Sequence, residues 1–202
     1  MIGEHDPPCN GVVADLSSYR YDTGVFRPGS APSAPASAAR LAALLDRFAV
    51  VMDLNMPLLE LRDLPIVGRS FYGCNFSHSV LTNCTIRDCT FELCFFDFSR
   101  HAEGLYENVH AKNCVFACSE FRGVTIRGSD LIQCNFNAIR GTSVLFDDCD
   151  LFHSRFNASM VESMEITNCN VKEARFIRTS AETLQFKYAN QEDAVFVNEE
   201  AW

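Results

Sequence analysis

Large apolar residues recur at every fifth position through most of this chain. From Cys74 onward the first of them are Phe76, Leu81, Ile86, Phe91 and Phe96. An α-helix would space its apolar residues three and four apart, and a half-buried β-strand would space them two apart. The pattern therefore predicts a structure built from a repeat of five residues.

The five-residue register runs from Ile66 to Phe196 without an insertion or deletion. It has 27 central positions, and twelve of them are Phe. The central positions that depart from a bulky apolar residue are His101, Ala111, Gly141, Ala181 and Gln191. Eight of the ten Cys stand two residues before a centre, where most other residues are small. Each unit thus reads small, polar, bulky apolar, polar, polar.

If four units form one coil, residues 20 apart in the sequence stack on each other. One such column is Phe at seven successive places: Phe76, Phe96, Phe116, Phe136, Phe156, Phe176 and Phe196. Coils at the ~4.8 Å spacing of paired strands would stack these rings as aromatic ladders do. We expect this column to form the structural core.

Units such as CNFSH, CTIRD, CNFNA and SRFNA carry a resemblance to the pentapeptide-repeat family, whose motif is commonly written A(D/N)LXX. The resemblance covers roughly two thirds of the chain. It implies an all-β fold, a right-handed quadrilateral parallel β-helix of about seven coils. Members of the family that resemble B-form DNA, among them quinolone-resistance proteins, engage DNA gyrase through an acidic face, so the resemblance also raises that function.

The sequence outside the repeats predicts an arm and a cap. Residues 1–37 lack periodicity and end in a Pro/Ala/Ser-rich stretch, so we expect a flexible N-terminal arm and linker. Residues 38–65 begin with an apolar helical stripe that extends to Met52, which predicts a helix capping the first coil. The β-helix would then occupy 66–198, followed by a C-terminal tail at 199–202.

Composition narrows the class of protein. The net charge is −9, the N-terminus lacks the pattern of a secretory signal, and no apolar run approaches 18 residues. We expect a soluble, cytoplasmic, bacterial protein that does not contact a membrane. Direct binding to nucleic acid would demand clustered Lys and Arg, which an acidic chain does not favour.

No catalytic, cofactor or metal motif stands out. The five His show no metal-binding spacing, and no phosphate loop or nucleophile elbow occurs. Thiols of Cys84, Cys89 and Cys94 would point inward from three sides of a packed tube, where zinc ligands could not converge. We expect reduced Cys as small core filler, no cofactor, no metal and no enzymatic activity. His101 has two interpretations: a pH sensor or ligand contact, or a core or corner His bonded to a turn carbonyl.

The expected outer surface contains charge ladders and two kinds of candidate contact site. One column reads Arg87, Glu107, Arg127, Asp147, and another reads Arg100, Glu120, Arg140, so alternating charges should pair between coils. Asp130, Asp147, Asp148 and Asp150 should form an acidic patch rather than a rod. Outward stacks of Ile132 with Phe152 and of Phe95 with Val115 are candidate contacts for a partner, or else lie under the N-terminal segment.

The C-terminal end offers a candidate dimer contact. Val195, Phe196, Val197 and Trp202 close the chain without a predicted helix over the last coil. Two copies related by a two-fold axis would cover each other there. The alternative is that Trp202 folds back over Phe196 as a plug.

The sequence leaves three functional hypotheses. The leading one is a non-catalytic protein-interaction module, a rigid rod that binds an unidentified partner protein through its outer faces. Its rival is a DNA-mimicking modulator or protector of DNA gyrase or topoisomerase. A third is a bacterial effector secreted by means of the arm.

Overall fold

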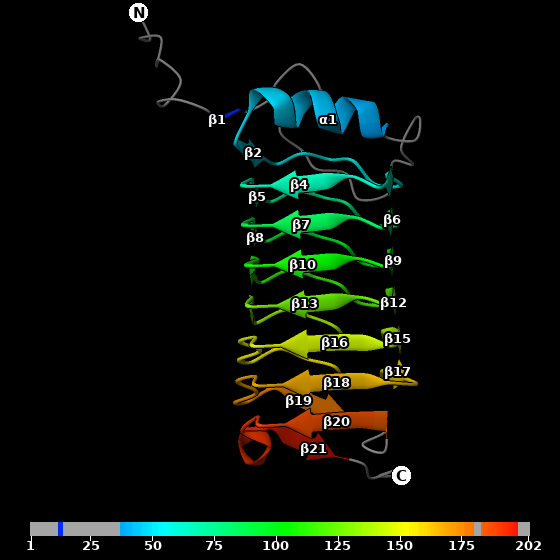
Figure 1. The fold of residues 1–202 in the computed structure, drawn as a ribbon, viewed down its shortest axis with the longest axis vertical. Coiled ribbons are helices and arrows are strands. Elements are labelled where there is room, and N and C mark those ends of the chain that lie inside the picture. The colour runs from blue at the N-terminus through cyan, green and yellow to red at the C-terminus, as the bar shows by residue number, and fades with distance from the viewer. Residues whose placement is uncertain (1–11, 14–36, 180–182, 198–202) are drawn as a thin grey trace, which may run out of the picture.

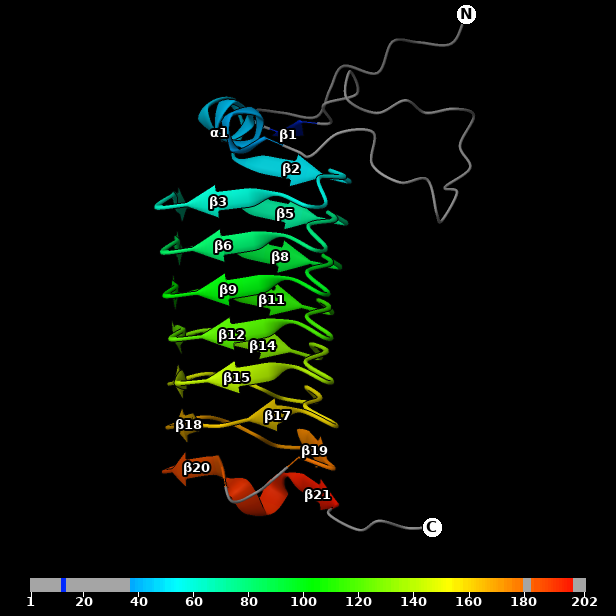
Figure 2. The same ribbon diagram turned by 90° about the vertical axis from the view of Figure 1, so that its right-hand side faces the viewer.

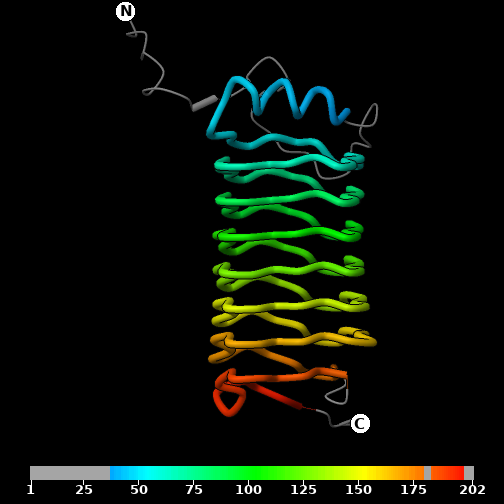
Figure 3. Tube along the Cα trace, in the orientation of Figure 1, coloured from blue at the N-terminus to red at the C-terminus, as the bar shows by residue number. Residues whose placement is uncertain are grey.

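The computed structural model describes residues 12–13, 37–179 and 183–197. They form a four-sided parallel β-solenoid of stacked coils with one α-helix across its N-terminal end (Figures 1 and 2). The trace winds in stacked coils along the rod (Figure 3). The expected arm and tail lie largely outside the described residues. No helix in the described part of the chain is long and apolar enough to cross a membrane.

Side 1 of the rod begins at the N-terminal end with a short strand from the arm. Its strands are β1 (Val12–Val13), β2 (Val50–Met52), β5 (Ser70–Tyr72), β8 (Thr90–Glu92), β11 (His110–Lys112) and β14 (Asp130–Ile132). β1 pairs in parallel with β2. Below β14 the side continues through isolated bridges from Asp130 to Asp150 and Asn170, and it ends near a 3-10 turn at Gln191–Asp193.

Side 2 follows side 1 along the chain and is mostly held by isolated bridges. These join Asn55, Asn75, Phe95, Val115, Asn135, Arg155 and Arg175 in turn. Its only full strands among the described residues are β19 (Arg175–Ile177) and β21 (Val195–Val197), which pair in parallel.

Sides 3 and 4 are regular sheets. Side 3 contains β3 (Glu60–Arg62), β6 (Val80–Thr82), β9 (Arg100–Ala102), β12 (Glu120–Arg122), β15 (Arg140–Thr142) and β17 (Met160–Val161). Side 4 contains β4 (Pro65–Val67), β7 (Thr85–Arg87), β10 (Leu105–Glu107), β13 (Thr125–Arg127), β16 (Val144–Asp147), β18 (Met164–Thr167) and β20 (Leu184–Lys187). Paired residues lie 20 apart in sequence, as in Phe121 with Gly141.

The predicted Phe column is confirmed on side 2. Its seven rings stack in sequence, with centroids 4.9 to 5.2 Å apart. Phe136, in mid-column, is 1% exposed. Because each of the five inner rings is covered above and below by another, the stack fills one side of the core continuously.

The corners between sides adopt a backbone conformation that the sequence analysis did not predict. Except for Ser163, every corner residue from Asp53 to Arg178 has a positive φ, which lies between 50° and 61° for the residues other than Gly, as at Leu58 and Asp53. This left-handed conformation is unfavourable for residues with a Cβ, and Asn and Asp tolerate it best. Here Leu93 and Phe98 also adopt it, at φ 55°, which directs two large apolar side chains outward.

The helix is shorter than expected and the solenoid begins earlier. Helix α1 spans Ala38–Arg47 rather than reaching Met52, and it buries Leu41, Leu44 and Leu45. Ser37 caps it by accepting a hydrogen bond from the Arg40 N–H, 3.2 Å away. The Arg69 Nε donates to the Leu45 carbonyl at 3.1 Å and so ties the end of the helix to the coil below.

The expected boundary at residue 66 therefore differs from the structure. The inward residues Val51, Met56 and Leu61 already follow the five-residue register and are buried. Pro57 is compatible with the five-residue register, because a residue at its position donates no backbone hydrogen bond to another coil. At the equivalent place one coil below, the Ser77 N–H donates to the side chain of Asn75 instead.

The Phe column predicts a large effect for one core substitution. Phe136→Ala should lower the free energy of unfolding by about 3 to 5 kcal/mol, because it leaves a cavity between two rings that stay stacked on their other neighbours. Urea unfolding followed by far-UV circular dichroism would measure it. Phe98→Ala, at a ring that is 55% exposed, is the control and should cost less than about 1 kcal/mol. Equal losses in the two variants would contradict the column as the core.

Candidate interaction surfaces

The predicted acidic patch is assembled along the corner between sides 4 and 1. Asp130 and Asp150 point outward from side 1, Asp147 ends β16 on side 4, and Asp148 is the exposed corner residue between the two sides. Asp130, Asp147 and Asp150 have partners within the chain. The four carboxylates therefore form a patch, but three of them already interact with side chains of neighbouring coils.

Hydrogen bonds from neighbouring coils hold these carboxylates. The Asp130 carboxylate lies 2.8 Å from His110 Nδ1. Asp150 accepts from the Asn170 side-chain amide at 2.9 Å. Asp147 accepts from the amide of Asn168 at 3.1 Å, instead of pairing with Arg127 as the expected ladder would require.

The alternating ladders are confirmed in their first members. Glu107 forms ion pairs with Arg87 above and Arg127 below. Hydrogen bonds from these two guanidinium groups hold the pKa of Glu107 below its usual value. Arg100 Nε contacts Glu120 at 3.1 Å. These pairs reduce the net field of sides 3 and 4.

The two apolar stacks lie on different sides of the rod. Ile132 and Phe152 are half-buried on side 1, beside Asp130 and Asp150. Phe95 and Val115 are bridged to each other on side 2, and Phe95 is 45% exposed. The structure therefore divides the predicted partner surface into an acidic and aromatic group on side 1 and an apolar group on side 2.

Sequence reasoning missed several exposed residues that enlarge the side 2 group. Leu93 and Phe98 are each 55% exposed, at the two corners that flank side 2 in the coil that carries Phe95. Phe98 is held by the His78 ring, which stacks on it at 5.0 Å. In the sequence, Leu93 and Phe98 stand two residues after an inward centre, a position that is mostly polar or small in the other units. The five-residue pattern alone does not indicate that this position is an outward-pointing corner.

Side 2 also carries arginines that the sequence analysis did not single out. Arg155 and Arg175 are bridged neighbours and are exposed, and Arg178 is exposed at the next corner. Within the part of the chain that the structure describes, no carboxylate forms an ion pair with any of the three.

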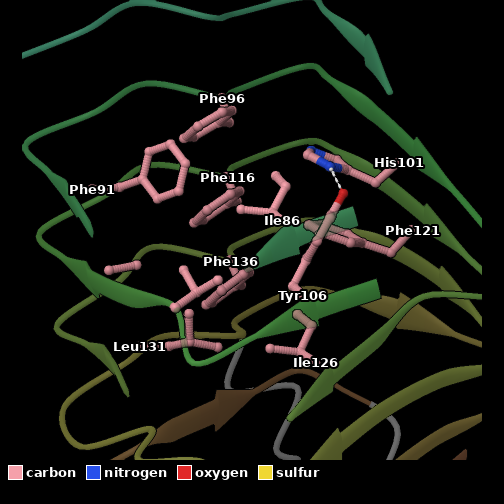
Figure 4. Close-up of a pocket in the computed structure, with 12 residues that line it drawn as sticks. Ile86, Phe91, Phe96, His101, Tyr106, Phe116, Phe121, Ile126, Leu131 and Phe136 are labelled. Carbon is pink, nitrogen blue, oxygen red and sulfur yellow. Dashed lines mark hydrogen bonds between the residues drawn. The ribbon is translucent and has the colours of Figure 1, made fainter. Parts of the chain in front are cut away.

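His101 is a buried core residue of side 3, as the structural interpretation predicted, but its partners are side chains. Its Nε2 lies 2.7 Å from Ser99 Oγ and its Nδ1 lies 2.8 Å from the Tyr106 hydroxyl (Figure 4). The expected bond from His101 to a turn carbonyl is not direct. The Ser99 hydroxyl, which contacts His101, donates to the carbonyl of Phe96. The neutral ring stacks on Phe121 with centroids 4.7 Å apart. Burial lowers the pKa of His101 to about 3.

Small residues make room for this network and leave a void. Gly104 lies against the Tyr106 ring, and a Cβ there would come within 3.1 Å of the hydroxyl. An apolar cavity of about 30 Å³ is lined by His101, Tyr106, Ala111 and the rings around them (Figure 4). Ala111 stacks between Phe91 and Leu131 on side 1, so the cavity lies where one bulky inward residue is replaced by a methyl group.

The inward Cys act as small donors to the backbone. Each thiol of the column Cys74, Cys94, Cys114 and Cys134 donates to a carbonyl oxygen of the coil above, at 3.4 to 3.6 Å. Burial raises the pKa of the Cys84 and Cys89 thiols. Among the residues described, no three His, Cys, Asp or Glu side chains are grouped as metal ligands.

At the C-terminal end the last described strand is β21. Val195 and Val197 are each 40% exposed, and Phe196 stacks on Phe176 at 5.1 Å. Trp202 lies outside the described residues. The end-to-end contact and the Trp202 plug both remain predictions.

No protein-family model matches the chain, and no curated protein sequence matches it. Its fold is similar to a trypsin-treated variant of QnrB1, a plasmid-mediated fluoroquinolone resistance protein, with 13% identity over 74% of this chain and 80% of that chain and a TM-score of 0.54. Full-length QnrB1 is 14% identical over 76% of this chain and 85% of that one, with a TM-score of 0.46. Rfr23, a pentapeptide repeat protein from the cyanobacterium Cyanothece 51142, is 11% identical over 61% and 94%, with a TM-score of 0.39.

The His101 network predicts a pH dependence of stability. The pKa falls from 6.5 to about 3 on folding, so the unfolded chain binds a proton first as the pH drops, and the free energy of unfolding decreases below pH 6.5. Between pH 7.5 and 4.5 the wild type should lose about 2 to 3 kcal/mol more than His101→Leu/Tyr106→Phe, which removes both the titrating ring and its hydroxyl partner.

Urea unfolding at the two pH values measures this difference. Comparison with the variant cancels the contribution of the carboxylates, which titrate in both chains. An identical loss in the two proteins would show that His101 does not remain neutral in the folded state.

Proposed function

Because the chain has the quadrilateral β-helix fold of pentapeptide repeat proteins, we propose that it is a non-catalytic interaction protein that binds a partner protein through the outer faces of the rod. The observation that carries the proposal is the division of the side chains. Inward side chains are buried in the stacks of the core and cannot contact a partner. Large apolar residues such as Phe95 and Phe98 point outward and are 45% and 55% exposed. Outward aromatic residues on a rigid scaffold are favourable anchors for a protein partner.

The second candidate is a modulator or protector of DNA gyrase or topoisomerase. It is supported by the likeness to QnrB1 and by the acidic corner of Asp130, Asp147, Asp148 and Asp150. The ion pairs of Glu107 with Arg87 and Arg127 on side 4 weigh against it, because a DNA-like face requires a continuous negative potential. We therefore rank it second.

The proposal also covers the C-terminal end. β21 pairs with β19 on one edge, and its exposed Val195 and Val197 are suited to burial against a second copy. End-to-end pairing would bury only the ends of the two rods, so the outer sides of both copies would stay accessible to a partner protein.

An affinity capture and a supercoiling assay together test the proposed function. Purified full chain should capture a specific host protein at near-stoichiometric yield, and substitution of an outward aromatic residue, such as Phe98→Ser, should reduce the capture. It should leave gyrase supercoiling, and its inhibition by a fluoroquinolone, unchanged at micromolar concentration.

Two results would overturn this ranking. Protection or inhibition of gyrase that is lost in Asp147→Asn/Asp148→Asn would favour the topoisomerase candidate. The matched control is Asp53→Asn/Asp63→Asn, which removes two carboxylates from the corners between sides 1 and 2 and between sides 3 and 4. Failure to capture any protein, with the rod shown to be folded, would count against the interaction function itself.

A further inference from the structure

Side 2 differs from the other three sides in both chemistry and charge. Its N-terminal half and adjoining corners expose Leu58, Leu93, Phe95 and Phe98, which are 43 to 55% exposed. Its C-terminal half exposes Arg155, Arg175 and, at the corner, Arg178. The two halves lie on one flat side of one rigid rod, opposite the sheet of β4 to β20 that faces the viewer in Figure 1.

Among the described residues, no carboxylate forms an ion pair with the arginines of the basic half. Within the described residues the only carboxylate on side 2 itself is Asp97, which already accepts from the Ser77 hydroxyl at 2.6 Å. At the neighbouring corner Glu173 contacts His153 at 2.6 Å, and Asp193, one coil below, accepts from the Asn190 side-chain amide at 3.0 Å. The arginines therefore present uncompensated positive charge on a chain whose net charge is −9, whereas those in the ladders of sides 3 and 4 alternate with carboxylates.

Two asparagines on side 2, Asn137 and Asn157, add hydrogen-bond donors to those of the arginines. The side-chain oxygen of Asn137 accepts from the Asn157 backbone N–H at 2.9 Å, and that of Asn157 accepts from the Ile177 N–H at 3.1 Å. A backbone N–H can only donate, so these contacts fix which amide atom is the oxygen. The NH₂ groups are left as donors beside Arg155 and Arg175. Because amide NH₂ and guanidinium groups can only donate, the complementary ligand is one that supplies acceptors and negative charge.

We propose that side 2 binds an extended acidic peptide segment of a partner protein, with an apolar side chain seated against Phe95 and Phe98 and carboxylates paired with Arg155 and Arg175. This inference rests on the proposed interaction function and assigns it to a face. Arg binds carboxylates through two parallel hydrogen bonds, which suits a peptide of this kind.

The register sets the spacing that the peptide must satisfy. Phe95 is three coils from Arg155 and four from Arg175, which is roughly 14 to 19 Å at ~4.8 Å per coil. An extended chain advances about 3.3 Å per residue, so the apolar anchor and the acidic residues should be about four to six residues apart. The small corner residues Ala138 and Ala158 leave the path between the two halves open on that edge.

A nucleic acid fits this face less well than a peptide. Three arginines would neutralise few phosphates, while the remainder of an acidic chain would repel a polyanion. A short peptide brings only two or three negative charges, and its apolar side chain uses the aromatic half directly.

Selection from a phage-displayed library of random 12-residue peptides on the immobilised full chain tests the assignment. Enriched sequences should combine Phe, Leu or Trp with Asp or Glu four to six residues away. Synthetic, fluorescein-labelled copies should then bind the wild type, measured by fluorescence anisotropy. Affinity should fall at least about tenfold in Arg155→Glu/Arg175→Glu and, separately, in Phe98→Ser.

The matched control is Arg122→Glu/Arg140→Glu on side 3, which makes the same change in net charge and should alter affinity less than about twofold. Circular dichroism would confirm that every variant keeps the rod. Enriched peptides without carboxylates, equal losses in the two arginine pairs, or no enrichment would each overturn the assignment to side 2. Loss of binding in Asp147→Lys/Asp148→Lys alone would leave the interaction function standing and move it to the acidic corner.

Other occupants of side 2 would be identified by photo-cross-linking from benzoylphenylalanine placed at position 98. Cross-links to an added peptide support the proposal. Cross-links to residues 1–36 of the same chain would assign the patch to the arm, and cross-links between two copies would assign it to a dimer. Tighter binding of a 20-nucleotide single strand than of any selected peptide, lost in Arg155→Glu/Arg175→Glu, would replace the peptide by nucleic acid. Each of these three results would overturn the peptide proposal.

Discussion

The stacking of inward side chains at the spacing of paired strands is the interaction on which this structure depends. Backbone hydrogen bonds between coils require residues 20 apart to lie about 4.8 Å from each other, and flat Phe rings stack well at 4.9 to 5.2 Å. The two spacings agree, so the hydrogen-bond ladder and the aromatic column reinforce each other at every coil. Departures are accommodated locally, as where His101 stacks on Phe121 and bonds to two hydroxyl groups.

The same constraint determines what the outer surface can be. Every outward residue has a fixed neighbour 20 residues before and after it, so a column of substitutions becomes a stripe along the rod. Glu107 between two arginines makes a stripe of alternating charge, whereas Arg155 above Arg175 makes a stripe of one sign. Because the core fixes these positions, recognition properties can vary on one side without altering the other three, and an interaction function follows naturally from such a scaffold.

The inward half of the structure could be predicted from the sequence because it repeats. A period of five and a column of seven Phe identify the coil and its core without any long-range information. The start of the solenoid at Val50 was missed, since Val51 also fits the apolar stripe of the helix predicted up to Met52. The exposed Phe98 and the unpaired Arg155 were missed because they depend on corner geometry and on which charges lie opposite each other. A repeat pattern does not encode those contacts.

The central claim is that a register of 20 residues governs the whole rod, and insertions test it most directly. One variant would carry a second copy of residues 121–140, and another a single alanine between Phe121 and Arg122, with thermal unfolding of both followed by far-UV circular dichroism. The account predicts that the 20-residue insertion keeps the spectrum and melts at or above the wild-type temperature, because it adds one complete coil. The single alanine should lower the transition sharply, because it shifts every later side chain out of phase. A single-alanine variant as stable as the wild type, or a duplicated coil that prevents folding, would contradict the account.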